Sequence, residues 1–183
     1  ARFSAPGEAF AGLAKRKVLP GSGKALAVWT DKPVMLLPDK LLDILSWRKP
    51  KKVFINSVSD TFHADVSFEF IAALWAFMAC ASHVTFQIVT KRARRMREFF
   101  EWTRANGGPD HWLRCARAMV DEQHSHATER RYSSAADRWA HASVTLEKRF
   151  KAVTARAEIT SGLPNMMALE NVWLLVSTEN QET

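Results

Sequence analysis

The chain has 183 residues, 47% hydrophobic and 25% charged, a composition that supports one folded domain with a hydrophobic core. Its longest apolar run, Phe68–Cys80, is interrupted by Glu69 and is too short for a membrane span, and no signal peptide is recognisable. The formal charge of +7 favours solubility and weak attraction to polyanions, but does not by itself indicate nucleic-acid binding.

The first third of the chain predicts little regular structure before a strand. Residues 1–35 are rich in Gly and Pro and are predicted to be irregular, with one turn of helix near Phe10–Lys15. Pro38–Ile44 is predicted as a short helix with Asp39 near its start. Lys52–Ser57 follows a proline and is apolar and β-prone, which predicts a buried strand.

A strand–helix–strand unit follows. The helix is predicted over Val66–Ala81 with Asp65 as its cap, and because it is apolar nearly all round we expect protein to cover most of it. The second strand is predicted over His83–Thr90, and this spacing predicts parallel strands joined by a right-handed crossover. A third helix over Arg92–Arg104 ends at the turn-forming residues Asn106–Pro109.

Two long helices of mixed charge are predicted over Asp110–Arg131 and Ala135–Glu158, before a third buried strand over Asn171–Ser177. The chain therefore predicts an α/β fold of parallel strands with crossover helices, carrying a helical insertion over about 103–165. Three parallel strands cannot close a barrel. Both ends of the sequence look cut, so we expect residues 1–183 to be a fragment of one α/β domain, completed by its missing remainder or by a second copy.

Polar side chains follow all three predicted strands, at the edge where parallel α/β folds place their binding sites. They are Asn56, Ser57, Ser59, Asp60 and His63 after the first strand, Thr90, Lys91 and Arg92 after the second, and Ser177, Glu179 and Asn180 after the third. Turn and cap chemistry explains any one of them equally well, but their coincidence favours a site for substrate or cofactor. None is assigned a catalytic role.

Five cations stand in the first turns of the predicted third helix, where the helix dipole prefers anions. Lys91 and Arg92, nearest the strand end, predict a phosphate, a carboxylate ligand or an acidic partner. A solvated basic face is the open alternative, and it suits Arg94, Arg95 and Arg97 better.

Three other features of the sequence argue against a phosphate-binding loop, a metal site and a disulfide. Gly21–Lys24 lacks the residues that complete a phosphate-binding loop. His124 and His126 are two apart on a predicted helix and point in different directions, so no metal site is predicted. Cys80 and Cys115 are far apart in sequence, which indicates free thiols in a reducing compartment and hence a cytoplasmic protein.

Three blocks carry a more specific signal: Phe54–His63 reads FINSVSDTFH, Thr85–Arg97 reads TFQIVTKRARRMR, and Asn171–Gln181 reads NVWLLVSTENQ. In order, they resemble the FVNSMSDLFH, TFQVLTKRxxRMR and NVWLGVSVENQ blocks of a bacteriophage and prophage protein family of unknown function that is radical-SAM-like. Shorter upstream matches such as Leu45–Pro50 follow the same order. The resemblance spans nearly the whole chain outside 103–165.

The resemblance implies a partial, TIM-like βα barrel. It also implies a [4Fe–4S] cluster on a cysteine-rich loop that ends in C-x-x-C-Y-A, and S-adenosylmethionine as cofactor for radical chemistry. This chain has neither that loop nor the relatives' G-G-E-S-G block, and two cysteines cannot hold the cluster. We therefore expect no cofactor on this chain by itself.

The leading hypothesis is thus the central part of a phage radical-SAM-like enzyme, inactive alone, whose substrate is related to nucleic acid. In it, the resemblance implies a cavity lined by Asn56, Ser57, Asp60 and His63, with Lys91, Arg92 and Glu179 binding polar parts of cofactor or substrate. The alternative is a non-catalytic phage protein that binds nucleic acid or a host complex through a basic surface. Both hypotheses place the protein in the bacterial cytoplasm, with nucleic acid or another anionic ligand as partner.

Overall fold

The computed structural model describes residues 14–18, 20–21, 23–29, 34, 36–56, 59–129, 133–161 and 169–177. The chain divides into two compact units, residues 1–35 and 36–183. The first contains an antiparallel hairpin of β1 (Ala14–Val18) and β2 (Ala25–Trp29), in which Val18 pairs with Ala25. That the whole chain acts as one domain stays a prediction.

The prediction of irregular structure in residues 1–35 is wrong, because β1 and β2 form a ladder there. The helical turn expected near Phe10–Lys15 is wrong at Ala14 and Lys15, which lie in β1, and residues 10–13 lie outside the described residues. Gly21 and Gly23 have φ of 80° and 64°, a conformation that glycine adopts without strain. These glycines indicated irregular structure in the sequence, but they lie in the connection between the two strands of the hairpin.

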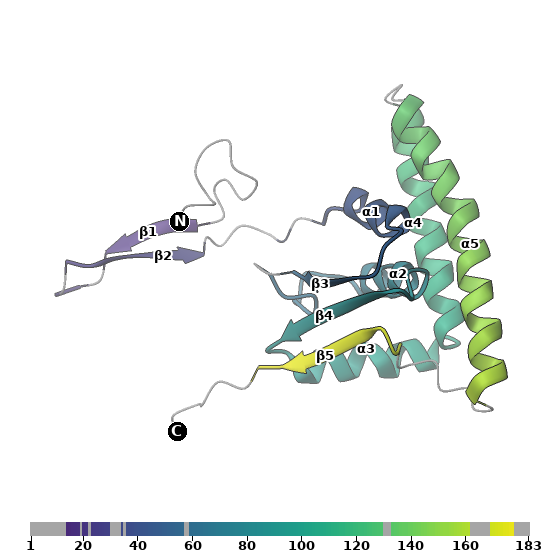
Figure 1. Ribbon diagram of the computed structural model, residues 1–183. Coiled ribbons are helices and arrows are strands. Elements are labelled where there is room, and N and C mark those ends of the chain that lie inside the picture. Colours follow the sequence, from purple (N-terminus) through teal and green to yellow (C-terminus); the bar gives the residue numbers. More distant parts are fainter. Residues whose placement is uncertain are drawn as a thin grey trace. The chain divides into compact units, whose positions relative to one another are not determined.

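The second unit contains a parallel sheet in the order β3–β4–β5, with its helices on one side (Figure 1). Its strands are β3 (Lys51–Ile55), β4 (Val84–Thr90) and β5 (Val172–Val176). Its helices are α1 (Asp39–Ser46), α2 (Phe68–Ala79), α3 (Ala93–Ala105), α4 (Pro109–Glu129) and α5 (Ser133–Ser161). The predicted order of strands, crossover helices and helical insertion is confirmed, whereas a TIM-like barrel stays a prediction.

Helix α2 is the centre of this unit, and every residue from Ile71 to Ala79 is buried. It begins two residues later than predicted, because the backbone N–H of Val66 first donates to the His63 carbonyl in a turn. The Ser67 side chain caps the helix by accepting a hydrogen bond from the Phe70 N–H. The prediction of Asp65 as the cap is therefore wrong.

The outer side of α2 is covered by the α4–α5 hairpin, which is the helical insertion. Trp112 of α4 and Leu146 and Phe150 of α5 are almost completely buried. The Cys80 thiol, just after α2, donates to the Leu146 carbonyl oxygen across this interface. The chain itself thus supplies the protein that the all-round apolar helix was expected to need.

Asn171 joins the start of β5 to the end of α2. Its side-chain amide donates to the carbonyl oxygens of Met78, Ala81 and Val84 at 3.0, 3.2 and 3.1 Å. These carbonyls lie at the α2–β4 connection, where the Met78 and Ala81 carbonyls also accept from the backbone N–H groups of Ala81 and Val84, so one amide adds a second donor to this tight connection. The insertion of more than sixty residues is thereby closed at its base.

The other face of the sheet, called here the open face, carries no helix among the described residues. Along β4 the side chains alternate between buried and half-buried, and Phe54 and Trp173 on the flanking strands are 49% and 47% exposed. The prediction that the first and third strands are buried is therefore wrong, because both are edge strands: β3 is exposed at Phe54, and β5 is exposed from Trp173 to Val176, on both of its faces. No helix in the described residues is long and apolar enough to cross a membrane.

The burial of α5 predicts a large effect of one core substitution. Leu146→Ala removes a side chain that is 0% exposed and should lower the free energy of unfolding by about 3 kcal/mol. Val144→Ala, two residues away on the same helix but 70% exposed, should change it by less than about 0.5 kcal/mol. Urea unfolding followed by circular dichroism measures both, and equal effects would show that α5 does not pack on α2.

Candidate functional site

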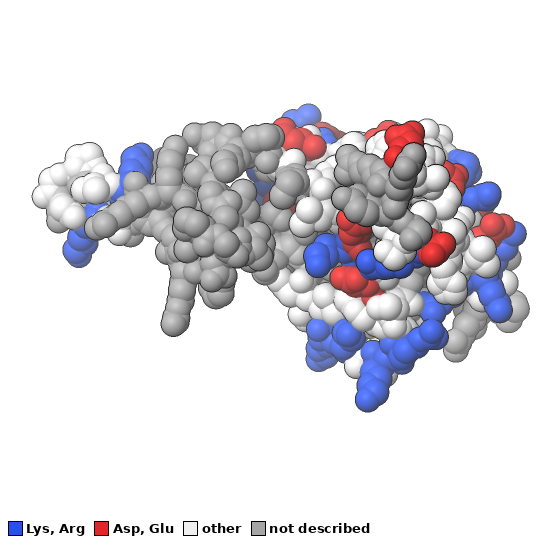
Figure 2. Space-filling model, turned by 90° about the horizontal axis from the view of Figure 1, so that it is seen from above, with Lys and Arg blue, Asp and Glu red and all other residues white. Residues whose placement is uncertain are grey.

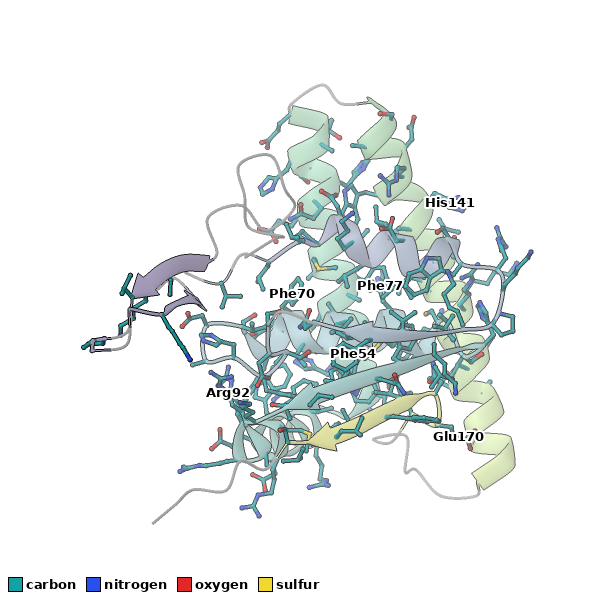
Figure 3. The ribbon with its side chains drawn as sticks, turned by 60° about the vertical axis from the view of Figure 1, so that its left-hand side comes forward. Phe54, Phe70, Phe77, Arg92, His141 and Glu170 are labelled. Carbon is teal, nitrogen blue, oxygen red and sulfur yellow. The ribbon has the colours of Figure 1, made fainter. Side chains whose placement is uncertain are left out.

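The carboxyl ends of β3, β4 and β5 lie along one edge of the sheet, as the polar strand ends predicted. The backbone N–H of Ser177, after β5, donates to the Thr90 carbonyl at the end of β4. Arg92 also lies at this edge, whereas Glu170 precedes β5 at the opposite edge (Figure 3). Parallel pairing therefore brings together residues as far apart in sequence as Thr90 and Val176.

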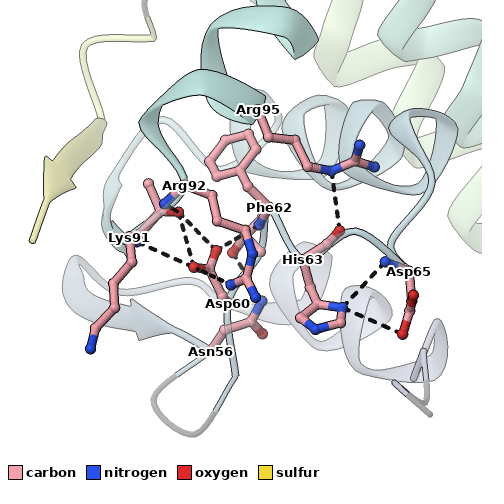
Figure 4. A network of polar contacts seen from close by, with 10 residues as sticks. Asn56, Asp60, Phe62, His63, Asp65, Lys91, Arg92 and Arg95 are labelled. Carbon is pink, nitrogen blue, oxygen red and sulfur yellow. Dashed lines mark hydrogen bonds and ion pairs between the residues drawn. The ribbon is translucent and has the colours of Figure 1, made fainter.

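Asp60 is the centre of the polar contacts at this edge (Figure 4). The Thr90 hydroxyl reaches its two carboxylate oxygens at 2.9 and 3.0 Å, and the Arg92 guanidinium lies 2.9 Å from Oδ2. The backbone N–H groups of Phe62 and Lys91 donate to it at 2.8 and 3.3 Å. The Asp60 side chain is only 15% exposed, so this carboxylate is held by donors on nearly every side.

These contacts decide the protonation state of Asp60. Burial raises the pKa of this carboxyl, but the hydrogen bonds from Phe62, Thr90, Lys91 and Arg92 outweigh burial and hold the pKa below the ordinary value of 3.8. Asp60 is therefore an anion at neutral pH with its lone pairs in use. It is suited to fix the loop after β3 against the start of α3, and is poorly suited to act as a general base.

Asn56 shapes the loop that carries Asp60. It has φ of 58°, the left-handed region that Asn tolerates better than most residues. Its side-chain amide donates to the Thr61 hydroxyl at 2.9 Å, and its carbonyl accepts from the Ser59 N–H. Asn56 and Thr61 thus close the loop, and Ser59 remains exposed at its tip.

His63 follows on the same loop, and its ring Nδ1 lies 3.2 Å from the Asp65 backbone nitrogen and 3.5 Å from the Asp65 carboxylate. Arg95, assigned to the surface in the sequence analysis, instead donates to the carbonyl oxygens of His63 and Val66 at 3.2 and 2.8 Å. Its guanidinium also lies over the Phe68 ring. Arg95 therefore fastens this loop to α3, because it lies three residues after Arg92 on the side of the helix that faces the loop. No local signal in the sequence indicates these contacts.

The cations at the start of α3 have partners within the chain. Asp60 supplies the anion expected near this helix terminus, through Arg92 and the Lys91 N–H. Arg94 pairs with Glu98 at 2.9 Å and Arg97 with Glu101 at 3.8 Å, both one turn along the exposed face. Lys91 is exposed and Arg92 is 40% exposed, so these two remain the groups best placed to meet a ligand.

The structure thus brings together Asn56, Ser59, Asp60, His63, Thr90, Lys91, Arg92 and Ser177 at one edge of the sheet. Ser57, Glu179 and Asn180 lie outside the described residues. Whether these residues bind a substrate or a cofactor stays a prediction, because their contacts also serve the fold.

The cysteines do not fit an iron–sulfur cluster. Burial raises the pKa of the Cys80 thiol to about 12, and burial followed by the charge of Glu69 raises that of Cys115. Both are free thiols, Cys80 buried just after α2 and Cys115 half-buried on α4, and a cluster requires at least three thiolates. No group of three or more His, Cys, Asp or Glu residues that could hold a metal ion occurs within the described part of the chain.

Comparison with known proteins identifies the family. The family model described as "Protein of unknown function (DUF5131)" matches residues 8–183, and the chain therefore belongs to this family. Neither a curated protein nor a solved structure matches the chain significantly.

The contacts of Asp60 predict a pH-dependent loss of stability in Asp60→Asn. The amide turns a donor towards the donors of Thr90 and Arg92, so unfolding at pH 7 should become about 1–3 kcal/mol easier. A folded-state pKa below 3.8 stabilises the fold above that pH, and this advantage is lost as pH falls through the folded pKa. The difference between wild type and variant should therefore shrink below about pH 4.

Urea unfolding at several pH values measures this difference. Asp65→Asn is the matched control, because Asp65 lies on the same loop but its side chain is 58% exposed, so less than about 1 kcal/mol is expected. A variant of Asp60 that loses no more stability than this control, or loses it equally at all pH values, would contradict the proposed role of the carboxylate.

Proposed function

We propose that the chain is the central part of a radical-SAM-like enzyme of bacteriophage origin, whose ligand binds at the carboxyl edge of the β3–β4–β5 sheet. The observation that carries the proposal is that Asp60 joins the first two strand-end blocks through Thr90 and Arg92, while Ser177 of the third block donates to the Thr90 carbonyl at the same edge. These are the same blocks on which the resemblance to the radical-SAM-like family rests. Parallel α/β enzymes bind their ligands at this edge of the sheet.

The division of labour within the site follows from its contacts. Asp60, Thr90 and Asn56 hold the loop after β3 against β4, so they position the edge and do not leave groups free for a ligand. Lys91 and Arg92 present positive charge there, which suits a carboxylate or a phosphate of the cofactor or substrate. His63 adds an imidazole on the same loop, with its Nδ1 3.2 Å from the Asp65 backbone nitrogen.

The implied cluster is not held by these residues. A [4Fe–4S] cluster would supply the electron that cleaves S-adenosylmethionine, but two cysteines, one of them the buried Cys80, are too few to bind it. Its thiolates must therefore come from residues other than these 183, and the chain alone is proposed to be inactive. We propose cytoplasmic action on a substrate related to nucleic acid.

A non-catalytic role is the second candidate, and the lack of cluster-binding thiolates favours it. In that case the chain would act in the phage-infected cell by binding nucleic acid or a host complex through exposed cations such as Arg48, Lys49 and Lys51. This candidate requires no ligand at the carboxyl edge.

Expression of the complete natural reading frame without oxygen separates the two candidates. The enzyme predicts a polypeptide heavier than 20.7 kDa that contains about four irons, the number in one [4Fe–4S] cluster, and absorbs visible light accordingly. The 183-residue chain, expressed in the same way, is the control and should contain no iron. A complete product that also lacks iron would contradict the enzyme and favour the binding protein.

A further inference from the structure

The open face of the sheet carries two aromatic side chains in one row. In the parallel register Phe54 pairs with Gln87, and Gln87 pairs with Trp173, so these side chains point from the same face side by side. Phe54 is 49% and Trp173 is 47% exposed. A half-buried amide therefore lies between two exposed rings on a rigid sheet.

Cations border this row. The ammonium group of Lys52 lies 5.6 Å from the centre of the Trp173 ring, so a positive charge and an exposed ring face are already adjacent. Arg48 and Lys49 are exposed just before β3, whereas the ammonium group of Lys51, at the start of β3, lies 4.3 Å from the centre of the Trp47 ring and on the other face of the strand. On the other edge strand, the exposed acidic residue Glu170 lies just before β5. Figure 2 shows Lys and Arg side chains gathered in groups on the surface of this unit.

We propose that the open face binds single-stranded nucleic acid. Phe54 and Trp173 stack on bases, Lys52 and the cations before β3 bind phosphates, and the Gln87 amide faces the edge of a base between the rings. Sheets that bind single strands combine exposed aromatic rings with flanking cations in this way, because every base offers a ring face and every phosphate a charge. This site is on the face of the sheet and not at its carboxyl edge, so it does not depend on the proposed enzyme.

The same features argue against other occupants. The bases of a duplex are stacked on one another, so a duplex would contact the cations but not Phe54 and Trp173. A second copy of the chain that met the open face would bring the same cations against each other. A lipid surface gains nothing from an amide placed between two rings, and the cost of burying that amide disfavours it.

Fluorescence anisotropy with a labelled oligothymidylate of about 16 nucleotides, the upper site size of one small binding fold, tests the proposal. The whole 183-residue chain should bind this single strand more tightly than a duplex of equal length. Trp173→Ala and Phe54→Ala should each weaken binding about fivefold or more, whereas Trp173→Phe should retain most of it. Lys52→Gln should lower the slope of log affinity against log salt by about 0.7, the value for one phosphate of a single strand.

Lys148→Gln is the matched control, because it removes one charge from α5, where Lys148 is exposed. This substitution should change the affinity for the single strand by less than about twofold. Circular dichroism confirms that each variant is folded. The proposal is overturned by equal affinity for single strand and duplex, by a loss of affinity in Lys52→Gln but in neither aromatic variant, or by tighter binding to anionic vesicles. Self-association that Trp173→Ala abolishes, without binding of the oligonucleotide, would assign the open face to a second copy instead.

Discussion

The fold of residues 36–183 depends on one constraint, which is that α2 has no polar face. A helix whose residues from Ile71 to Ala79 are all buried needs protein on every side, and a three-stranded sheet covers only one of them. The α4–α5 hairpin covers another, with Trp112, Leu146 and Phe150 among its buried side chains. What reads in the sequence as an insertion is therefore the outer layer of the core.

This constraint also places the polar residues. Because β3 and β4 are parallel and α2 joins them, the loops after β3 and β4 emerge at the same edge. Asp60 then meets Thr90 and Arg92, and one carboxylate fastens the two loops and supplies the anion at the start of α3. The site thus combines a rigid frame with the cations Lys91 and Arg92, which remain accessible at its rim.

The chain belongs to DUF5131, and the proposed ligand site at the carboxyl edge rests on the polar contacts of Asp60 there, while two cysteines are fewer than a cluster requires. The open face is a separate surface. Its exposed rings and flanking cations differ in chemistry from the carboxyl edge, where hydrogen-bonded side chains dominate. The two proposals therefore concern different surfaces and can be tested separately.

Local patterns predicted most elements of the second unit. The apolar runs before Asn56 and Thr90 gave strands within two residues of their observed bounds, and the glycines after Asn106 ended α3 as expected. Local patterns failed in the first unit, where Gly21 and Gly23 indicated irregular structure. There a hairpin forms because Val18 pairs with Ala25, and the pairing energy of a ladder comes from the partner strand.

In the second unit, the sequence by itself determined the element order, the parallel pairing and the polar residues that follow the strands, because periodicity, spacing and turn chemistry are local properties. Only the tertiary structure decided which side chains are partners and which are exposed. Arg95 donates to two backbone carbonyls, Asn171 donates to the carbonyls of the α2–β4 connection, and Trp173 in an apolar strand is exposed. These outcomes depend on groups distant in sequence and on which face of the sheet is covered, and neither is encoded in the neighbouring residues.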